Sequence, residues 1–313
     1  MQLRKLGAGA PPVSELGLGV APLTRPTAAV NDPVSGIATV HRAIERGVTF
    51  FDTAESYDHN NNEKILGKAL KGHRHNVVVA TKFGIYHEAG KPRSNNGTPA
   101  NAIRACDTSL KSLDMEVIDL FYLHRVDPNV PVEETIGAMA GLIETGKVRF
   151  LGISACTADE LRRAHATHPM AALQSEYSLF SRDVEDEILP LCRELRIAFV
   201  PYAPLWRGVI AGTYVANRNK GTDADALARK DAEFLKPLTD MAAAKGATVP
   251  QIAIAWLLAK GDDIIPIPGT KQVTYLEENL KAAEIELTRD DVAKLDAAFP
   301  PGIDQKVLAA RKV

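Results

Sequence analysis

The stretch Val48-Thr49-Phe50-Phe51-Asp52-Thr53-Ala54-Glu55-Ser56-Tyr57 joins a strand pattern to a group of polar residues. Its first four residues are β-branched and aromatic, which is typical of a strand buried on both faces of a parallel sheet. Asp52 ends this run, and Tyr57 follows in a polar loop. Enzymes built on such sheets have their catalytic residues at the carboxyl ends of the strands. Asp52 and Tyr57 alone, however, could equally be capping or packing residues.

Two further strand patterns end in the same way. Residues 76–80 lead to Lys82, and residues 117–123 lead to His124. Because parallel strands end at the same edge of a sheet, both side chains are expected to lie beside the aspartate and tyrosine of the first stretch. A single lysine or histidine at a strand end is usually solvated or structural. Complementary ionisable groups on successive strands instead indicate an active site.

Strand and helix patterns alternate along the chain. The alternation predicts one (β/α)8 TIM barrel domain over residues 1–313, preceded by an N-terminal β-hairpin and followed by extra C-terminal helices, rather than a doubly wound sheet. The hairpin is expected at residues 3–6 and 13–16. The predicted strands are residues 17–20, 48–51, 77–80, 117–123, 148–153, 171–173, 197–200 and 263–267, and the predicted helices are 33–46, 63–70, 100–112, 132–144, 158–166, 184–194, 231–244, 248–259, 273–281 and 288–299.

Two predicted loops are unusually long. Residues 84–99 and 205–230 are rich in Gly, Asn and basic residues. Long loops within a compact barrel are usually functional lids or disordered tips, so both are expected to enclose substrate in part. The tail at 306–313 is expected either to fold over an end of the barrel or to fray.

Composition excludes several classes of protein. The 313 residues are 45% hydrophobic and carry a formal net charge of -2, which gives no support for nucleic acid or an anionic membrane as the main partner. No apolar stretch has the length of a membrane span, and the N-terminus lacks a signal-peptide core, so we expect a cytoplasmic protein. The sequence does not distinguish a monomer from a homo-oligomer.

The three cysteines do not form a recognisable site. Cys106, Cys156 and Cys192 are odd in number, widely spaced and not grouped with histidines. We therefore expect no disulfide framework and no metal site.

Taken together, the motifs resemble the aldo-keto reductases over nearly the whole chain. The sequence around His124 and Gln174 is most similar to the microbial and plant branch of the family, which includes pyridoxal-reductase-like and auxin-induced-type members. The matching pieces are residues 51–57 with Asn62, Glu63, Leu66 and Gly67, residues 80–82, 122–127, 146–154, 174–178, 201–205, 267–271 and 276–279.

The resemblance implies a barrel that binds NADPH and a catalytic tetrad of Asp52, Tyr57, Lys82 and His124. Carbonyl reduction needs a hydride and a proton, and the cofactor supplies only the hydride. A tyrosine, with an ordinary pKa of about 10, becomes a useful acid when a nearby positive charge stabilises its phenolate. Tyr57 is thus the predicted proton donor, Lys82 and Asp52 support it, and His124 orients the carbonyl oxygen.

Family matching also implies where the cofactor lies. Ser154, Gln174 and Tyr202 are assigned to the nicotinamide end, although Gln174 could instead be an ordinary buried amide. Residues 269–271 precede a predicted helix, so their backbone N–H groups and the Lys271 cation are suited to bind a phosphate. The sequence has no Gly-x-Gly-x-x-Gly motif, which argues against a Rossmann domain. The remaining predicted cofactor-binding residues are Pro204, Leu205 and Arg207 after one strand, Gly269, Thr270, Lys271 and Gln272 at the phosphate, and Glu278 and Asn279 at the adenine.

The sequence departs from the family pattern in three places. Gln272 stands where a second basic residue is common, so NADPH is predicted, with NADH as a weaker alternative. The methionine-containing run after the first strand is replaced by residues 19–22. Trp206 replaces a usual glycine, and its indole could pack in the core, narrow the pocket or cover the pyrophosphate beside Arg207. Leu23, Phe83 and Trp206 are the predicted substrate-pocket residues.

These observations predict an NADPH-dependent reductase of aldehydes and some ketones, with alcohol dehydrogenase (NADP+)-type chemistry on a small carbonyl substrate. Two alternatives stay open. One is a nicotinamide-nucleotide sensor or regulatory subunit with little turnover, against which the intact tetrad counts. The other is an aldolase that uses Lys82 as a Schiff base.

Overall fold

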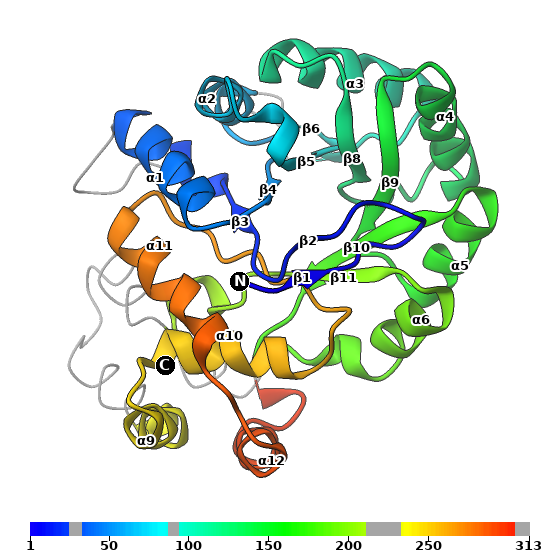
Figure 1. The fold of residues 1–313 in the computed structure, drawn as a ribbon. Coiled ribbons are helices and arrows are strands. Elements are labelled where there is room, and N and C mark those ends of the chain that lie inside the picture. Colours follow the sequence, from blue (N-terminus) through cyan, green and yellow to red (C-terminus); the bar gives the residue numbers. More distant parts are fainter. Residues whose placement is uncertain (25–32, 87–93, 211–232, 304–313) are drawn as a thin grey trace, which may run out of the picture.

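The computed structural model describes residues 1–24, 33–86, 94–210 and 233–303. Its centre is a sheet of seven parallel strands in the order β11-β10-β9-β8-β5-β4-β3, rolled into a nearly closed barrel (Figure 1). The (β/α)8 fold expected from the sequence is therefore confirmed. The strands are β3 (Leu18–Gly19), β4 (Phe50–Asp52), β5 (Val78–Phe83), β8 (Ile118–Leu123), β9 (Val148–Ser154), β10 (Met170–Glu176) and β11 (Ala198–Tyr202).

The segment 263–269 closes the barrel between β11 and β3 without forming a regular strand. It makes isolated parallel bridges, from Ile264 to Phe199 on one side and from Gly269 to Gly19 on the other. Pro266 and Pro268 fall within this segment, and proline has no N–H to donate to a ladder. The strand predicted at 263–267 is thus replaced by an irregular segment in the same place.

Helices surround the barrel (Figure 1). Several begin at residues that the sequence favours as caps: Thr157, Thr248 and Thr288 each form a reciprocal capping box. The helix predicted at 184–194 begins only at Ile188, after a 3-10 turn. The α-helices with named bounds are α1 (Pro33–Glu45), α2 (Asn61–Ala69), α3 (Pro99–Leu113), α4 (Val132–Glu144), α5 (Ala158–Thr167), α6 (Ile188–Leu195), α9 (Lys236–Lys245), α10 (Val249–Ala259), α11 (Val273–Leu280) and α12 (Arg289–Ala298).

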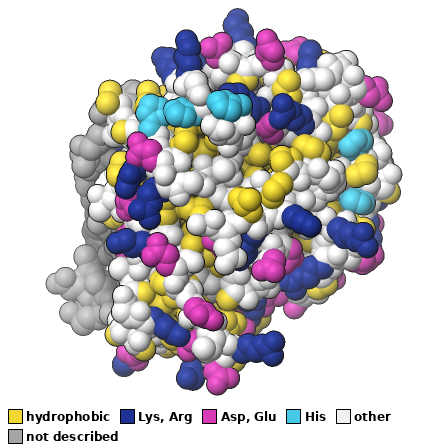
Figure 2. All heavy atoms as spheres, in the orientation of Figure 1, with side chains coloured by type: hydrophobic (Ala, Val, Ile, Leu, Met, Phe, Trp, Pro, Cys, Tyr) yellow, Lys and Arg dark blue, Asp and Glu magenta, His cyan; other side chains and the backbone are white. Residues whose placement is uncertain are grey.

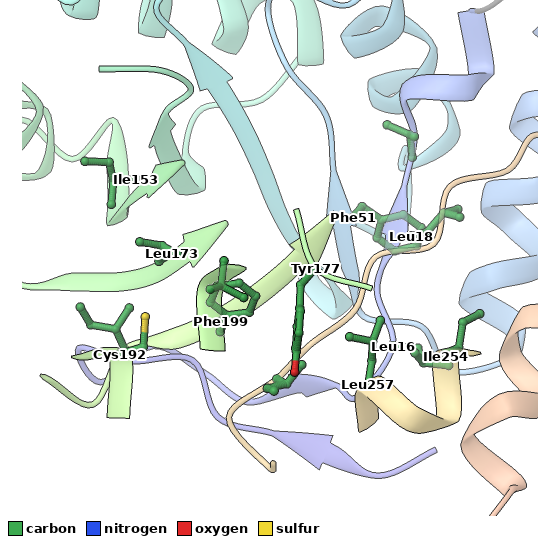
Figure 3. Close-up of a cluster of buried hydrophobic side chains, with 14 of the residues drawn as sticks. Leu16, Leu18, Phe51, Ile153, Leu173, Tyr177, Cys192, Phe199, Ile254 and Leu257 are labelled. Atoms are coloured by element: carbon green, nitrogen blue, oxygen red, sulfur yellow. The ribbon is translucent and has the colours of Figure 1, made fainter. Parts of the chain in front are cut away.

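Alternate residues of each strand supply two separate cores. Outward-facing side chains such as Phe51, Leu173 and Phe199 pack between the sheet and the helices, where Leu257 of α10 also lies (Figure 3). Inward-facing side chains fill the barrel itself, because successive strand residues point to opposite faces. Lys82 and Phe83, adjacent in β5, consequently belong to different layers.

The N-terminal hairpin closes the floor of the barrel. Strands β1 (Leu3–Arg4) and β2 (Val13–Ser14) pair antiparallel, as expected, and cross in front of the barrel in Figure 1. Leu6, Ala10 and Val13 pack with the inward-facing strand residues. Figure 2 shows this face, where basic and acidic side chains are mixed with apolar ones.

The long predicted loops are described only in part. Residues 84–99 include a small antiparallel pair, β6 (Ile85–Tyr86) with β7 (Ser94–Asn95). Residues 205–230 begin with a 3-10 turn, η4 (Trp206–Gly208). Residues 87–93 and 211–230 of these loops, residues 231–232 of one predicted helix and the tail at 306–313 lie outside the described residues.

Two absences hold for the described part of the chain. No group of three or more His, Cys, Asp or Glu side chains there could hold a metal ion. No single helix among those residues is long and apolar enough to cross a membrane, and only the bent pair α9 and α10 passes that test jointly.

We expect Gly67→Ala to destabilise the fold by about 1–3 kcal/mol, because overpacking has a cost of this size. Gly67 faces α3, and an added Cβ would overlap the backbone carbonyl of Leu113. Gly137→Ala, in α4, is the matched control, because no atom lies within 4 Å of its added Cβ. This control should be neutral or stabilise by up to about 1 kcal/mol. Urea unfolding measures both, and equal effects would contradict the packing argument.

Candidate active site

A buried ion pair lies at the carboxyl ends of the first strands. Asp52 is the last residue of β4, and Lys82 projects inward from the neighbouring β5. The Lys82 ammonium donates to Asp52 Oδ1 and, at 2.7 Å, to the backbone oxygen of Thr53. Lys82 has 0% exposure, so the strands fix its side chain in one position.

The surroundings of Lys82 keep it charged. Burial acts to lower its pKa, but attraction to Asp52 and then to Tyr57, with hydrogen bonding to both, raises the pKa above its ordinary value. Burial likewise raises the pKa of the Asp52 carboxyl, against the opposing effect of Lys82. A lysine in this setting is a fixed ammonium rather than a neutral amine.

Tyr57 and His124 complete a compact group around this ammonium. Lys82 Nζ lies 5.2 Å from the centroid of the Tyr57 ring. The His124 ring meets Tyr57 edge-on, with 6.0 Å between the centroids and an interplanar angle of 84°. The structure thus brings together all four residues that the sequence predicted as a tetrad.

A left-handed turn follows Tyr57. Asp58, His59 and Asn60 have φ values of 50°, 49° and 65°, and a run of three such residues without glycine is unusual. Asn60 Nδ2 donates to Glu63 Oε2 at 2.7 Å, which ties the turn to the first turn of α2. The turn fixes the backbone on which Tyr57 is carried.

The side of the site assigned to nicotinamide is joined to the ion pair by Gln174. Its Nε2 donates to Asp52 Oδ2 at 2.8 Å, so the amide carbonyl stays available as an acceptor. Ser154, the last residue of β9, is fully buried beside it, and the two residues are paired in the β9–β10 register. Tyr202 ends β11 and is half-buried.

Arg125 is a site residue that the sequence interpretation missed. Its guanidinium donates to Ser154 Oγ at 3.2 Å and to Tyr202 Oη at 3.4 Å, and it lies 5.8 Å from the Tyr202 ring centroid. The signal was present, since Arg125 directly follows His124 at a strand end. Its position in the chain alone does not show that its side chain reaches β9 and β11.

The predicted phosphate-binding residues lie on the same rim. Gly19 is paired with Asp52 on one side and bridged to Gly269 on the other, so Gly269 is level with the ion pair. Residues 270–272 continue beyond it to the start of α11. Within this group, Thr270 Oγ1 accepts from the backbone N–H of Gln272 at 3.1 Å, Lys271 and Asn279 are buried, and the backbone oxygen of Glu278 accepts from Gln251.

The predicted substrate-pocket residues are packed in the outer core. Phe83 has 1% exposure and stacks on Phe121 with 5.0 Å between ring centroids, because its strand directs Lys82 inward and Phe83 outward. Leu23 is buried and faces Gly36 of α1. This packing does not fit the prediction that Phe83 and Leu23 line the pocket.

Trp206 follows β11 and is also buried, with 7% exposure. Its ring contacts Phe180 at 5.1 Å, within an aromatic group that includes Phe299. The packing alternative for this residue therefore matches the structure better than a pocket wall. Of its neighbours, Pro204 is buried and Leu205 half-buried, and the Arg207 side chain lies outside the described part.

Fold and site together define a (β/α)8 barrel with an acid/base group at the carboxyl ends of its strands. The family model described as "Aldo/keto reductase family" matches residues 15–299. The chain therefore belongs to the aldo/keto reductase family, as the resemblance implied, and it is accordingly an oxidoreductase.

Individual relatives agree with this membership. A Glycine max protein named probable aldo-keto reductase 1 is 43% identical over 310 residues, covering 95% of this chain and 89% of that protein. An aldo-keto reductase from Klebsiella pneumoniae, solved in complex with NADPH, matches with a TM-score of 0.78 and 28% identity over 96% of each chain. The glycerol dehydrogenase from Gluconobacter oxydans matches with a TM-score of 0.83 and 25% identity, also over 96% of each chain.

Proposed function

We propose that the protein is an NADPH-dependent reductase that converts aldehydes and some ketones to alcohols. The observation that carries this proposal is the buried Lys82 ammonium, held by Asp52 and placed beside the Tyr57 ring with His124 edge-on to it. Such a group can deliver a proton to a carbonyl oxygen.

Each of the four residues has a separate task. Tyr57 donates the proton to the substrate oxygen, and Lys82 stabilises the phenolate that is left. His124 donates a hydrogen bond to the same oxygen and sets its orientation. Asp52 and the Thr53 carbonyl hold the ammonium in place. NADPH, when bound, supplies the hydride.

The residues at the nicotinamide end fit a carboxamide. Ser154 Oγ accepts from Arg125 and keeps its own hydrogen to donate, while the Gln174 carbonyl can accept from an amide N–H. Tyr202 can stack on the ring and fix the face that meets the substrate. The three side chains come from adjacent strands, which holds their spacing constant.

The phosphate end fits NADPH. Gly269 cannot carry a side chain without contacting the Gly19 carbonyl, so the glycine lets this segment lie close against β3. The backbone N–H groups that lead into α11 are suited to a phosphate. The Lys271 cation and the N-terminus of α11 add attraction. Glu278 and Asn279 on α11 are the residues that we assign to the adenine. The Klebsiella pneumoniae relative, solved in complex with NADPH, supports NADPH as the cofactor.

A screen of aldehydes, ketones and pyridoxal tests the proposal. We expect NADPH absorbance to fall in the presence of aldehydes and the matching alcohols to form, as measured by mass spectrometry. Tight NADPH binding without turnover on the whole panel would instead indicate a sensor. Borohydride trapping of a substrate on Lys82 would indicate an aldolase, a chemistry that the raised pKa of this lysine opposes because a Schiff base needs a neutral amine.

A further inference from the structure

Arg125 lies at the active-site rim but has no task in proton or hydride transfer. It follows His124 directly, and its guanidinium reaches across β9 to β11. Its three hydrogen bonds go to neutral acceptors: the backbone oxygen of His124 at 2.6 Å, Ser154 Oγ and Tyr202 Oη. These bonds hold the charged group in place without neutralising it.

Most other arginines in the described residues form an ion pair with Asp or Glu. Within the described ranges and the side chains resolved there, Arg125, Arg196 and Arg289 lack such a pair, and the last two are exposed to solvent. Arg125 is half-buried. A partly desolvated cation without a counter-charge favours the binding of an anion.

The guanidinium also has donors to spare. It carries five N–H groups in a planar fork, and the three hydrogen bonds use three of them. The Lys82 ammonium nearby is already matched by Asp52. Arg125 therefore presents a positive charge beside the tetrad that no Asp or Glu in the described residues matches with an ion pair, in a geometry suited to a carboxylate.

We propose that Arg125 determines substrate specificity by binding an anionic group, and that the preferred substrates are aldehydes that carry a carboxylate. This inference rests on the proposed reductase function, since it names the substrate class for the same site. The carboxylate pairs with Arg125 while the carbonyl oxygen lies between Tyr57 and His124. Arg125 would thus select and orient the substrate without taking part in the bond changes.

Steady-state kinetics test the proposal with 2-, 3- and 4-carboxybenzaldehyde and the methyl ester of each, which has a similar shape and no charge. In the wild type, the best carboxylate should exceed its ester in kcat/KM by at least about tenfold. Arg125→Gln should lower kcat/KM for that carboxylate by about 10- to 100-fold and leave the ester within about threefold. Arg125→Lys should restore part of the loss, because it keeps the charge but not the fork.

A binding measurement separates this inference from the reductase proposal. Calorimetric titration of the NADPH-loaded protein should show benzoate binding that weakens about tenfold or more in Arg125→Gln, while benzamide binding is unchanged. Arg162→Gln removes the same charge from an exposed ion pair and should behave like the wild type.

The outcomes are distinct. Equal losses for acid and ester, or unchanged benzoate binding in Arg125→Gln, would overturn the role of Arg125. Weaker NADPH binding in Arg125→Gln with unchanged benzoate binding would also overturn it and assign the residue to the cofactor. If the wild type binds benzoate and Arg125→Gln does not, but the wild type reduces no aldehyde, the anion site is supported and the reductase proposal is rejected.

Discussion

Tyr57→Phe should lower aldehyde turnover by about 10²–10⁴-fold, the usual contribution of a positioned acid. The substitution removes one hydroxyl and keeps the ring that packs against Lys82 and His124. NADPH binding should therefore stay within a few-fold of the wild type, and the free energy of unfolding should change little. Steady-state kinetics and quenching of protein fluorescence by NADPH measure the two effects.

The same variant can contradict the proposal. Near-normal turnover in Tyr57→Phe would show that another group supplies the proton. A parallel loss of NADPH binding would show that the hydroxyl is needed to bind the cofactor, so the lost turnover could not be assigned to proton donation. Tyr86→Phe, on an exposed tyrosine of the β6–β7 pair, is the matched control and should behave like the wild type.

Lys82→Met should abolish most turnover and also destabilise the protein by about 3–5 kcal/mol, because it leaves the Asp52 carboxylate buried without its partner. Adding Asp52→Asn should recover much of the lost stability but none of the activity. Urea unfolding of the single and double variants measures the difference. If the double variant were as unstable as Lys82→Met alone, the loss would come from packing rather than from the unpaired charge.

The pH dependence of stability in Lys82→Met has a defined direction. Burial raises the pKa of Asp52 above its ordinary value of 3.8, and removing the lysine removes the main opposing effect. A carboxyl with a raised pKa stabilises the folded state when protonated, so this variant should lose stability as the pH rises from about 4 through the raised value. The double variant, which lacks the carboxyl, should not show this loss.

The placement of the tetrad could be predicted because each member follows from a local pattern. Asp52, Lys82 and His124 stand at the ends of strongly apolar strands, and parallel strands bring such ends together. The substrate pocket could not be predicted in this way. Phe83 adjoins Lys82 in β5, yet adjacent strand residues point in opposite directions, and Phe83 packs in the outer core.

Other errors arose where tertiary context overrides a local pattern. The apolar residues at 264–267 indicate a strand, and the segment does make successive parallel hydrogen bonds with β11. Pro266 and Pro268 have no N–H to donate on the opposite side, so the bridge to β3 is isolated and no regular strand forms. Trp206 stands beside residues that match the cofactor site, and its partner Phe180 comes from a distant part of the chain. Contacts of this kind are set by the three-dimensional fold and leave no periodic signal.

The hairpin beneath the barrel determines from which end a proton can reach the proposed active site. Leu6, Ala10 and Val13 block the lower opening, and apolar side chains fill the shaft up to Lys82. In the proposed reaction, the proton that replaces the one donated by Tyr57 cannot pass through this apolar interior, so it must come from bulk water at the upper rim. In that reaction, reprotonation of Tyr57 and release of the alcohol both take place at the upper rim.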